Sequence, residues 1–341
     1  MNDAPVAWAD KDAFACQSSR RHLESTRSSL RCLLVTLICA GLTFEFALAE
    51  GSYPSLCLSN GQGEERSEPV ASDSGDARFP PQALLIPFDE TLAARSQRDW
   101  ADHLGVDVEF RNAGGIDFRL IPAGKFRIRR PDWVVARSGG PLWENISVDL
   151  PFFLGTKEVT QSQWLAVMGT RPWRDHQDVI EGEEYPASCI TWDNAVAFCE
   201  KVSRQDAVRY RLPSSAEWEF ACRAGTLTKY SCGDRDIDLV DYAWISASLG
   251  KPLTKCPQPV GKKKCNHFGL YDMHGNVSEW CQELYDPDSL GKRTPLRITR
   301  GGDFTTDGVG CTSSISAGGN STARSASFGF RVVRDAPRPA P

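Results

Sequence analysis

Cysteine is the residue type in this sequence with the widest range of chemistry, because its thiolate can bind metal ions, attack electrophiles and form disulfides. The chain of 341 residues contains twelve cysteines, of which nine lie after Ala49. Nine is an odd number, so at least one of them cannot pair within the chain. Neither a CxxC pair nor a Cys/His spacing typical of zinc occurs, so zinc is not expected. The nine are Cys57, Cys189, Cys199, Cys222, Cys232, Cys256, Cys265, Cys281 and Cys311.

Local spacing indicates what some of these cysteines do. Cys256 and Cys265 bracket a short loop that contains proline, glycine and lysine, and they are the best local candidates for a disulfide. Cys199 and Cys222 fall on the apolar faces of expected helices, where a cysteine usually packs as a small hydrophobic residue. The remaining connections cannot be read from spacing alone.

Histidine offers less chemistry than cysteine here. His274 lies in a loop, and a single histidine in such a place is more often structural than catalytic. GxSxG, HExxH and phosphate-loop motifs are absent, so the usual hydrolase and nucleotide-binding signatures are missing. The remaining histidines show neither an i, i+4 pairing nor a metal-binding motif: His22, His103, His176 and His267.

The N-terminal segment has the features of an export signal. Four arginines between Arg20 and Arg31 precede an apolar stretch from Cys32 to Leu42, and Ala47-Leu48-Ala49 follows. This order predicts a signal peptide over residues 1–49, with export to the periplasm, the cell envelope or the medium. The apolar run is shorter than the roughly 20 residues that a stable membrane span needs. Two alternatives are an internal start codon and an uncleaved segment that serves as an anchor.

Composition limits the classes of partner. The net charge is −5, and 24% of the residues are charged without a dominant Lys/Arg stripe, so nucleic-acid binding is not expected. Serine, glycine and acidic residues dominate the stretch from Ser59 to Asp76, which predicts a linker over residues 50–88.

Three helices can be placed by their capping residues, after a first helix expected over 89–104. Capping boxes at Thr160 and Ser214 open two of them, and Thr191 opens the third. Strand-like segments are expected at 106–110 and 118–121, with a turn at 113–115 between them. Little periodicity follows Gly225. We therefore expect one α+β domain over 89–336, irregular and loop-rich, with a short tail over 337–341.

Eight motifs in order resemble the sulfatase-modifying-factor (formylglycine-generating enzyme) family over roughly Trp100 to Arg334. The resemblance implies a single irregular α+β domain with an elaborated C-type-lectin-like fold, in agreement with the pattern of elements. The motifs are WADHLGVDVEF (100–110), LIPAGKFRI (120–128), EVTQSQW (158–164), ITWDNAVAFC (190–199), RLPSSAEWEFACRAGT (211–226), FGLYDMHGNVSEW (268–280), RGGDF (300–304) and FGFRVV (328–333).

The catalytic positions of that family are only partly matched. Its active members oxidise a sulfatase cysteine to formylglycine with oxygen, using copper(I) held between two enzyme cysteines. The matching positions are Thr306 and Cys311. A hydroxyl is a poor ligand for copper(I), which prefers soft sulfur, so copper binding is not expected. Asp303 stands where the family has a serine, and Ser278 where it has a tryptophan. Cys311 and Asp303 therefore remain the candidate catalytic residues.

A calcium site is implied by the same resemblance. Its ligands would be the carboxylates of Asp272 and Glu279 and the backbone carbonyls of Gly275 and Val277. Two carboxylates with carbonyls between them suit a hard cation that takes 6–8 oxygen ligands. The alternative is an ordinary loop with solvated acids. A second calcium site of the family has no clear counterpart, because Trp244 occupies one of its ligand positions.

Three functions remain open, because a fold does not determine an activity. The first is an exported, non-catalytic binding module that holds a protein, peptide or glycan ligand. The second is an oxidase that forms formylglycine through Cys311. The third is a different enzyme chemistry on the same scaffold, with Asp303 as acid or base.

Overall fold

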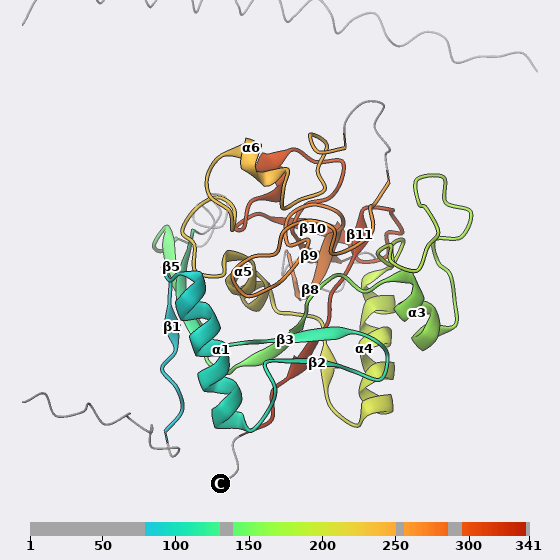
Figure 1. Cartoon of the computed structure of the whole chain (residues 1–341). Coiled ribbons are helices and arrows are strands. Elements are labelled where there is room, and N and C mark those ends of the chain that lie inside the picture. Colours follow the sequence, from blue (N-terminus) through green and yellow to red (C-terminus); the bar gives the residue numbers. More distant parts are fainter. Residues whose placement is uncertain (1–78, 130–138, 250–255, 286–294, 339–341) are drawn as a thin grey trace, which may run out of the picture. The chain divides into compact units, whose positions relative to one another are not determined.

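The computed structural model describes residues 79–129, 139–249, 256–285 and 295–338 (Figure 1). The predicted signal peptide, most of the predicted linker and Cys57 lie outside these ranges. In the described ranges there is no helix with the length and apolar character that crossing a bilayer requires. Strands in three sheets, helices and long connecting loops make up the domain, which confirms the α+β class.

The central sheet has five short strands in the order β2-β3-β6-β12-β7, and all of its neighbours are antiparallel. It joins the beginning of the domain to its end, because β12 pairs with both β6 and β7. The strands are β2 (Glu109–Arg111), β3 (Asp117–Ile121), β6 (Phe152–Gly155), β7 (Tyr210–Arg211) and β12 (Val333–Asp335).

The aperiodic C-terminal part of the sequence builds the second sheet, in the order β10-β9-β8-β11. A third sheet, in the order β1-β4-β5, forms an antiparallel hairpin of β4 and β5 with β1 added in parallel. The strands of these two sheets are β8 (Ser278–Leu284), β9 (Leu296–Arg300), β10 (Ser316–Asn320), β11 (Phe328–Gly329), β1 (Leu84–Leu85), β4 (Gly124–Arg129) and β5 (Trp143–Val148).

Three helices begin at the predicted capping residues, and α1 begins directly after Asp89, where a first helix was expected. Asp89, Thr160, Thr191 and Ser214 each accept a backbone N–H of the first turn, and the two predicted capping boxes are complete. These caps satisfy amides that have no partner within a helix. The elements are α1 (Glu90–Leu104), α3 (Gln161–Met168), α4 (Trp192–Asp206), α5 (Ser215–Arg223), the short α6 (Asp236–Leu239) and the 3₁₀ helix η2 (Gly308–Cys311).

Two apolar clusters form most of the core. In the first, α3 and α4 pack together, with the Trp164 ring stacked on Phe198 at 5.5 Å between centroids. The second surrounds α5, where Phe220 contacts Phe88, Phe126 and Phe268. Cys199 and Cys222 are buried in these clusters, as their helix positions predicted.

Three details of the sequence-based expectations are wrong. The linker does not extend to residue 88, because Leu84 and Phe88 are buried in the core and β1 pairs with β4. The strand expected at 106–110 begins only at Glu109. Cys256 and Cys265 form no disulfide. The Cys256 thiol lies 3.6 Å from the side-chain amide of Gln258, whereas Cys265 lies beside the Tyr271 hydroxyl.

Candidate functional site

The first candidate site is the turn that carries Thr306 and Cys311. The Thr306 Oγ1 lies 2.9 Å from the Cys311 Sγ. The same hydroxyl donates to the Asp303 carbonyl at 2.8 Å, which leaves its lone pairs free to accept the thiol proton and the Asp303 N–H, the latter at 3.1 Å. Gly302 makes room for this arrangement, since a Cβ at its position would overlap the Cys311 sulfur.

Burial suppresses ionisation of the Cys311 thiol. It raises the pKa to about 12 against the opposing effect of the Thr306 hydroxyl, and the carboxylates of Asp303 and Asp307 add to the rise. About one thiol in 10⁵ is ionised at pH 7 when the pKa is 12. Nucleophilic and metal-binding cysteines require the thiolate, so Cys311 is a poor candidate for either role as it stands.

Asp303 does not extend this site toward acid–base chemistry. Its Oδ1 accepts hydrogen bonds from the Thr305 amide at 2.8 Å and the Thr305 hydroxyl at 2.6 Å. The carboxylate is therefore used in hydrogen bonds within its own turn. Among the described residues, no second acid or base is paired with it.

His274 lies directly beneath the Cys311 turn. Its Nδ1 is 2.7 Å from the Cys311 carbonyl, and its Nε2 is 3.1 Å from the Ser231 backbone nitrogen. The amide can only donate, so Nε2 is the acceptor and Nδ1 carries the proton given to Cys311. Burial lowers the pKa of His274 to about 4. The ring is neutral and bridges the Cys311 carbonyl and the Ser231 amide.

The second candidate site consists of the turn at Asp272 and of Glu279 at the beginning of β8. Both Glu279 oxygens accept from the Arg331 guanidinium at 2.7 Å, and one also accepts from the Trp218 indole at 2.7 Å. Asp272 Oδ2 accepts from the Gly261 amide at 2.6 Å, whereas its buried Oδ1 has no hydrogen-bond partner. Asp272 therefore has one carboxylate oxygen without a hydrogen-bond partner, whereas both oxygens of Glu279 accept hydrogen bonds.

A third carboxyl group belongs to the same buried cluster. Glu158 is 1% exposed and accepts from the Asn276 side-chain amide at 2.8 Å and the Val277 amide at 3.2 Å. Burial, followed by the carboxylates of Asp272 and Glu279, raises the pKa of Glu158 well above its usual range. Burial likewise raises the pKa of Asp272 to about 6. Three carboxyl groups thus share one guanidinium, which leaves an excess of acid in the interior.

The fit to the two metals differs. Copper(I) needs two soft ligands, and the described turn supplies one protonated thiol and one hydroxyl, so the residues do not fit it. A calcium ion would give the Asp272 oxygen a partner and would offset the excess of buried carboxyl groups. The Glu279 carboxylate, however, already forms an ion pair with Arg331. In the described ranges, no three His, Cys, Asp or Glu side chains are arranged to hold a metal ion, so backbone oxygens would have to complete a calcium site.

Sequence reasoning missed Glu158 and Arg331 as members of this cluster. Both lie inside recognised motifs, EVTQSQW and FGFRVV. For Arg331 the available signal was a charged residue between Phe330 and Val332, since such a residue is almost never buried without a partner. Glu158 follows Lys157 and has no such signal. The spacing could not identify the partner, because Glu158 and Arg331 lie far from Glu279 along the chain.

The comparisons with known proteins agree with this fold and these motifs. A sequence model described as the sulfatase-modifying factor enzyme 1-like domain matches residues 111–336. The chain therefore belongs to the sulfatase-modifying-factor family.

Two curated relatives carry different names. A protein named "Chaperone protein LppX" from Paenibacillus barcinonensis is 31% identical over 201 residues, which cover 45% of this chain and 69% of that protein. The formylglycine-generating enzyme of Mycobacterium tuberculosis is 32% identical over 150 residues, 39% of this chain and 47% of that enzyme. One of these two relatives is therefore named as a chaperone and the other as an enzyme.

Solved structures share the fold. The structure of PvdO from Pseudomonas aeruginosa has a TM-score of 0.55 and 26% identity, and the match covers 67% of this chain and 97% of that one. Treponema denticola variable protein 1 has a TM-score of 0.57 and 24% identity, with 68% and 100% covered. The second likeness concerns the fold alone.

Proposed function

We propose that this chain is an exported, non-catalytic binding protein of the sulfatase-modifying-factor family. The observation that carries the proposal is the contact between Thr306 and Cys311. A hydroxyl stands where the family's oxidising members have a thiol, and the remaining thiol has a pKa of about 12. Export is supported by the basic, apolar and A-x-A segments that precede residue 50.

A binding role also agrees with one relative's name. The chaperone LppX is named for assistance to other polypeptides, and it aligns with this chain at 31% identity. A role in holding a polypeptide would use the scaffold without the oxidation chemistry. We propose that role here, in preference to formylglycine formation and to acid–base catalysis by Asp303.

An oxidation assay tests the proposal. The full chain is incubated with a sulfatase-type cysteine peptide, copper(I) and oxygen, and the peptide mass is followed. We expect no aldehyde product from the natural sequence. The Thr306→Cys variant is the matched comparison, because it restores the thiol pair with a side chain of similar size. Aldehyde formation by the natural chain that is lost in Cys311→Ser would refute the proposal and support the oxidase alternative.

We propose further that the Asp272 turn binds calcium. The support is the buried, unpartnered Oδ1 of Asp272 and the excess of buried carboxyl groups over guanidinium groups. Added calcium should raise the melting temperature of the natural chain, because a ligand that binds only the folded state stabilises it. The rise should vanish in Asp272→Asn and persist in Asp241→Asn, whose acid pairs with Lys264 at the surface. A melting temperature that calcium does not change would exclude the site.

A further inference from the structure

We propose that the exposed part of the β1-β4-β5 sheet binds an extended, acidic segment of another polypeptide that carries a bulky apolar side chain. The surface is defined by Leu85, Lys125, Arg127, Trp143 and Leu227, and it is called the hairpin surface below. The proposal rests on the binding role proposed above and names the surface and the class of partner. It does not depend on whether Cys311 is inactive.

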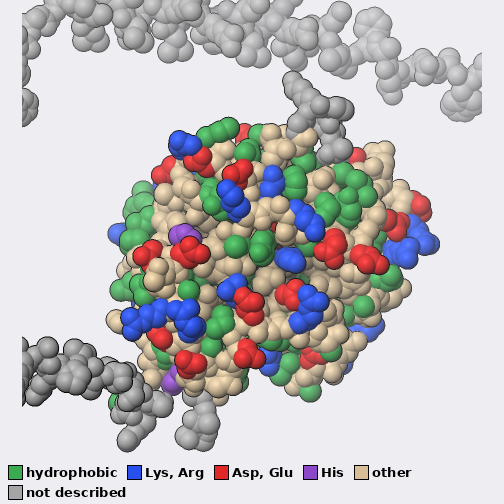
Figure 2. All heavy atoms as spheres, in the orientation of Figure 1, with side chains coloured by type: hydrophobic (Ala, Val, Ile, Leu, Met, Phe, Trp, Pro, Cys, Tyr) green, Lys and Arg blue, Asp and Glu red, His purple; other side chains and the backbone are tan. Residues whose placement is uncertain are grey.

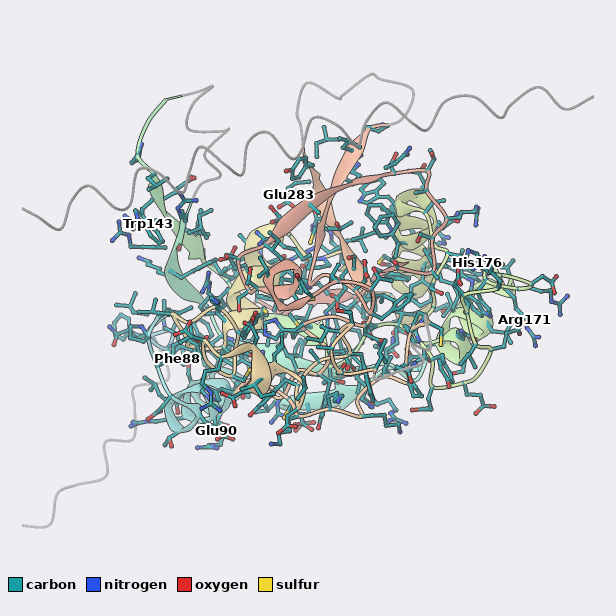
Figure 3. The ribbon with its side chains drawn as sticks, turned by 90° about the horizontal axis from the view of Figure 1, so that it is seen from above. Phe88, Glu90, Trp143, Arg171, His176 and Glu283 are labelled. Atoms are coloured by element: carbon teal, nitrogen blue, oxygen red, sulfur yellow. The ribbon has the colours of Figure 1, made fainter. Side chains whose placement is uncertain are left out.

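A cavity of about 990 Å³ lies at the hairpin surface. Leu85, Trp143 and Leu227 line it and are 60%, 48% and 68% exposed, respectively. Figure 2 shows hydrophobic side chains along the left edge of the domain, where β1 and β5 lie in Figure 1. Figure 3 places Trp143 toward the end of a hairpin that extends from the body. Large apolar side chains gathered around one hollow are typical of an interaction site.

The lining favours an apolar side chain as the occupant of the cavity. Ile86, Phe126 and Ile146 also line the cavity, and Phe126 at the same time packs in the core. The other five lining side chains are polar or charged: Lys125, Arg127, Asn145, Ser147 and Asp149. A Leu, Ile or Phe side chain can occupy the apolar part without a hydrogen-bond partner. Its burial would contribute about 1.5–3 kcal/mol.

The charges at the rim define the rest of the partner. Lys125 and Arg127 are two positions apart on β4, so they point to the same face. Both are exposed, and neither forms an ion pair within the described ranges, whereas Arg127 lies over the Trp143 ring at 5.6 Å. Asp149 also lines the cavity, but its carboxylate accepts from the Ser147 hydroxyl. Two cations against the one carboxylate of Asp149 leave the lining with a net positive charge, which complements an acidic segment.

The backbone of β4 offers a way to hold an extended chain. On its β1 side, β4 pairs only at Gly124 and Lys125. Ile86 donates to the Lys125 carbonyl at 3.3 Å, so the N–H and C=O of Arg127, two residues on, face the same side. Within the described ranges, no strand takes these groups up. An added strand could pair there, as peptides do when they extend a sheet edge.

The three features lie together and select a peptide over other ligands. The free strand edge would bind a backbone, the cavity an apolar side chain, and Lys125 with Arg127 one or two carboxylates. A lipid surface would use the cations and Trp143, but it would leave the strand edge without a partner. The geometry therefore points to an acidic peptide with one apolar anchor.

Phage display of random peptides on the full chain tests the proposal. We expect enrichment of sequences that combine Asp or Glu with a single large apolar residue. The enriched peptides, made synthetically, should bind Lys125→Glu/Arg127→Glu about tenfold or more weakly than the natural chain. They should also bind Trp143→Ser more weakly, because that change removes apolar contact without changing the charge.

The matched control reverses two charges elsewhere. Arg171→Glu/Arg174→Glu makes the same change in net charge at exposed positions, and Figure 3 shows Arg171 at the opposite side of the domain from Trp143. Equal binding to the natural chain and the hairpin variant would overturn the proposal, as would the absence of acidic–apolar enrichment. Two further outcomes would also overturn the proposal if no peptide is enriched. Binding of phosphatidylglycerol vesicles that the hairpin variant abolishes would assign the surface to lipid. Self-association that the hairpin variant abolishes would assign it to a second copy of the chain.

Hydrogen exchange separates strand addition from simple contact. A bound peptide that pairs with β4 should slow exchange of the Arg127 amide. Unchanged exchange of this amide at saturating peptide would refute the pairing even where binding is measured. The oxidation assay is independent of both measurements, so the two proposals can fail separately.

Discussion

The Thr306 hydroxyl and the Cys311 thiol form a 2.9 Å contact at the two positions that the family resemblance matches to copper-binding cysteines. The hydroxyl also bridges the Asp303 carbonyl and amide, so it holds the turn as well as the thiol. The Thr306 hydroxyl thus stabilises the turn at a position where the resemblance implies a metal-binding thiol in other members. His274 supports the turn as well, because it is hydrogen-bonded to the Cys311 carbonyl and to the Ser231 amide.

Thiol labelling should show how inaccessible Cys311 is. In the native protein at pH 8, iodoacetamide should modify the half-buried Cys232 and Cys265 well before Cys311, which is 0% exposed with a pKa of about 12. Mass spectrometry of the digested protein locates the label. The denatured protein serves as the control, because every thiol should then react. Rapid labelling of Cys311 in the native protein would contradict the assigned environment.

Replacement of Arg331 should be strongly destabilising. Its guanidinium is fully buried and donates to Glu279 and to the carbonyls of Gly155 and Tyr271. Arg331→Met would leave the buried Glu279 carboxylate without the guanidinium that binds both of its oxygens. Loss of one partner of a buried ion pair costs roughly 3–5 kcal/mol. Urea unfolding measures the loss.

The double variant Arg331→Met/Glu279→Gln is the informative control for that prediction. It removes the unpaired Glu279 charge, so it should be more stable than Arg331→Met alone. Equal stability of the two variants would show that Glu279 is not the main partner of Arg331.

Local rules in the sequence predicted the beginnings of the helices. The caps at Asp89, Thr160, Thr191 and Ser214 depend on residues within one turn of the chain, so spacing is enough to find them. The order of the motifs also singled out Cys311 as a candidate residue. It could not predict that Cys311 is buried and contacts Thr306, because both depend on packing.

Long-range contacts explain what the sequence could not predict. Arg331 reaches Glu279 across 52 positions, and Glu158 reaches Val277 across 119, so neither pairing leaves a local pattern. The hairpin surface was missed for a similar reason. Lys125 and Arg127 resemble ordinary exposed residues of a strand until the short β1 shows that part of the β4 edge is free. The wrong disulfide came from treating sequence proximity of Cys256 and Cys265 as contact.

Two glycines with left-handed backbones should differ in their tolerance of alanine. Gly105 and Gly275 have φ values of 64° and 79°. A Cβ at Gly105 would meet nothing within 4 Å, whereas one at Gly275 would overlap the Trp244 carbonyl. Gly105→Ala should therefore cost only the backbone term of about 1–2 kcal/mol. Gly275→Ala should cost about 1–3 kcal/mol more, because the backbone must move.

Thermal unfolding of the two glycine variants under one condition measures the difference. Gly105 ends α1, so its variant also reports on the C-cap itself. Equal losses would show that the Gly275 turn can shift without strain.

Acidification should destabilise the fold through His274. Burial lowers its folded pKa to about 4, whereas an unfolded histidine titrates near 6.5. Between these values the unfolded chain binds more protons, so the contribution of His274 is present above about pH 6.5 and is lost as the pH falls toward 4. Its size is on the order of 3 kcal/mol. Glu158 and Asp272 act in the opposite direction, because their folded pKa values are raised.

The comparison with His274→Gln isolates this residue from the carboxyl groups. The variant should be less stable than the natural chain at pH 7, because the amide cannot reproduce both the bond to the Cys311 carbonyl and the bond to the Ser231 amide. The stability difference between the two proteins should shrink as the pH falls from 7 to 4, since only the natural chain loses the histidine term. Urea unfolding at several pH values measures it. A difference that is constant over this range would show that His274 is not held neutral in the folded protein.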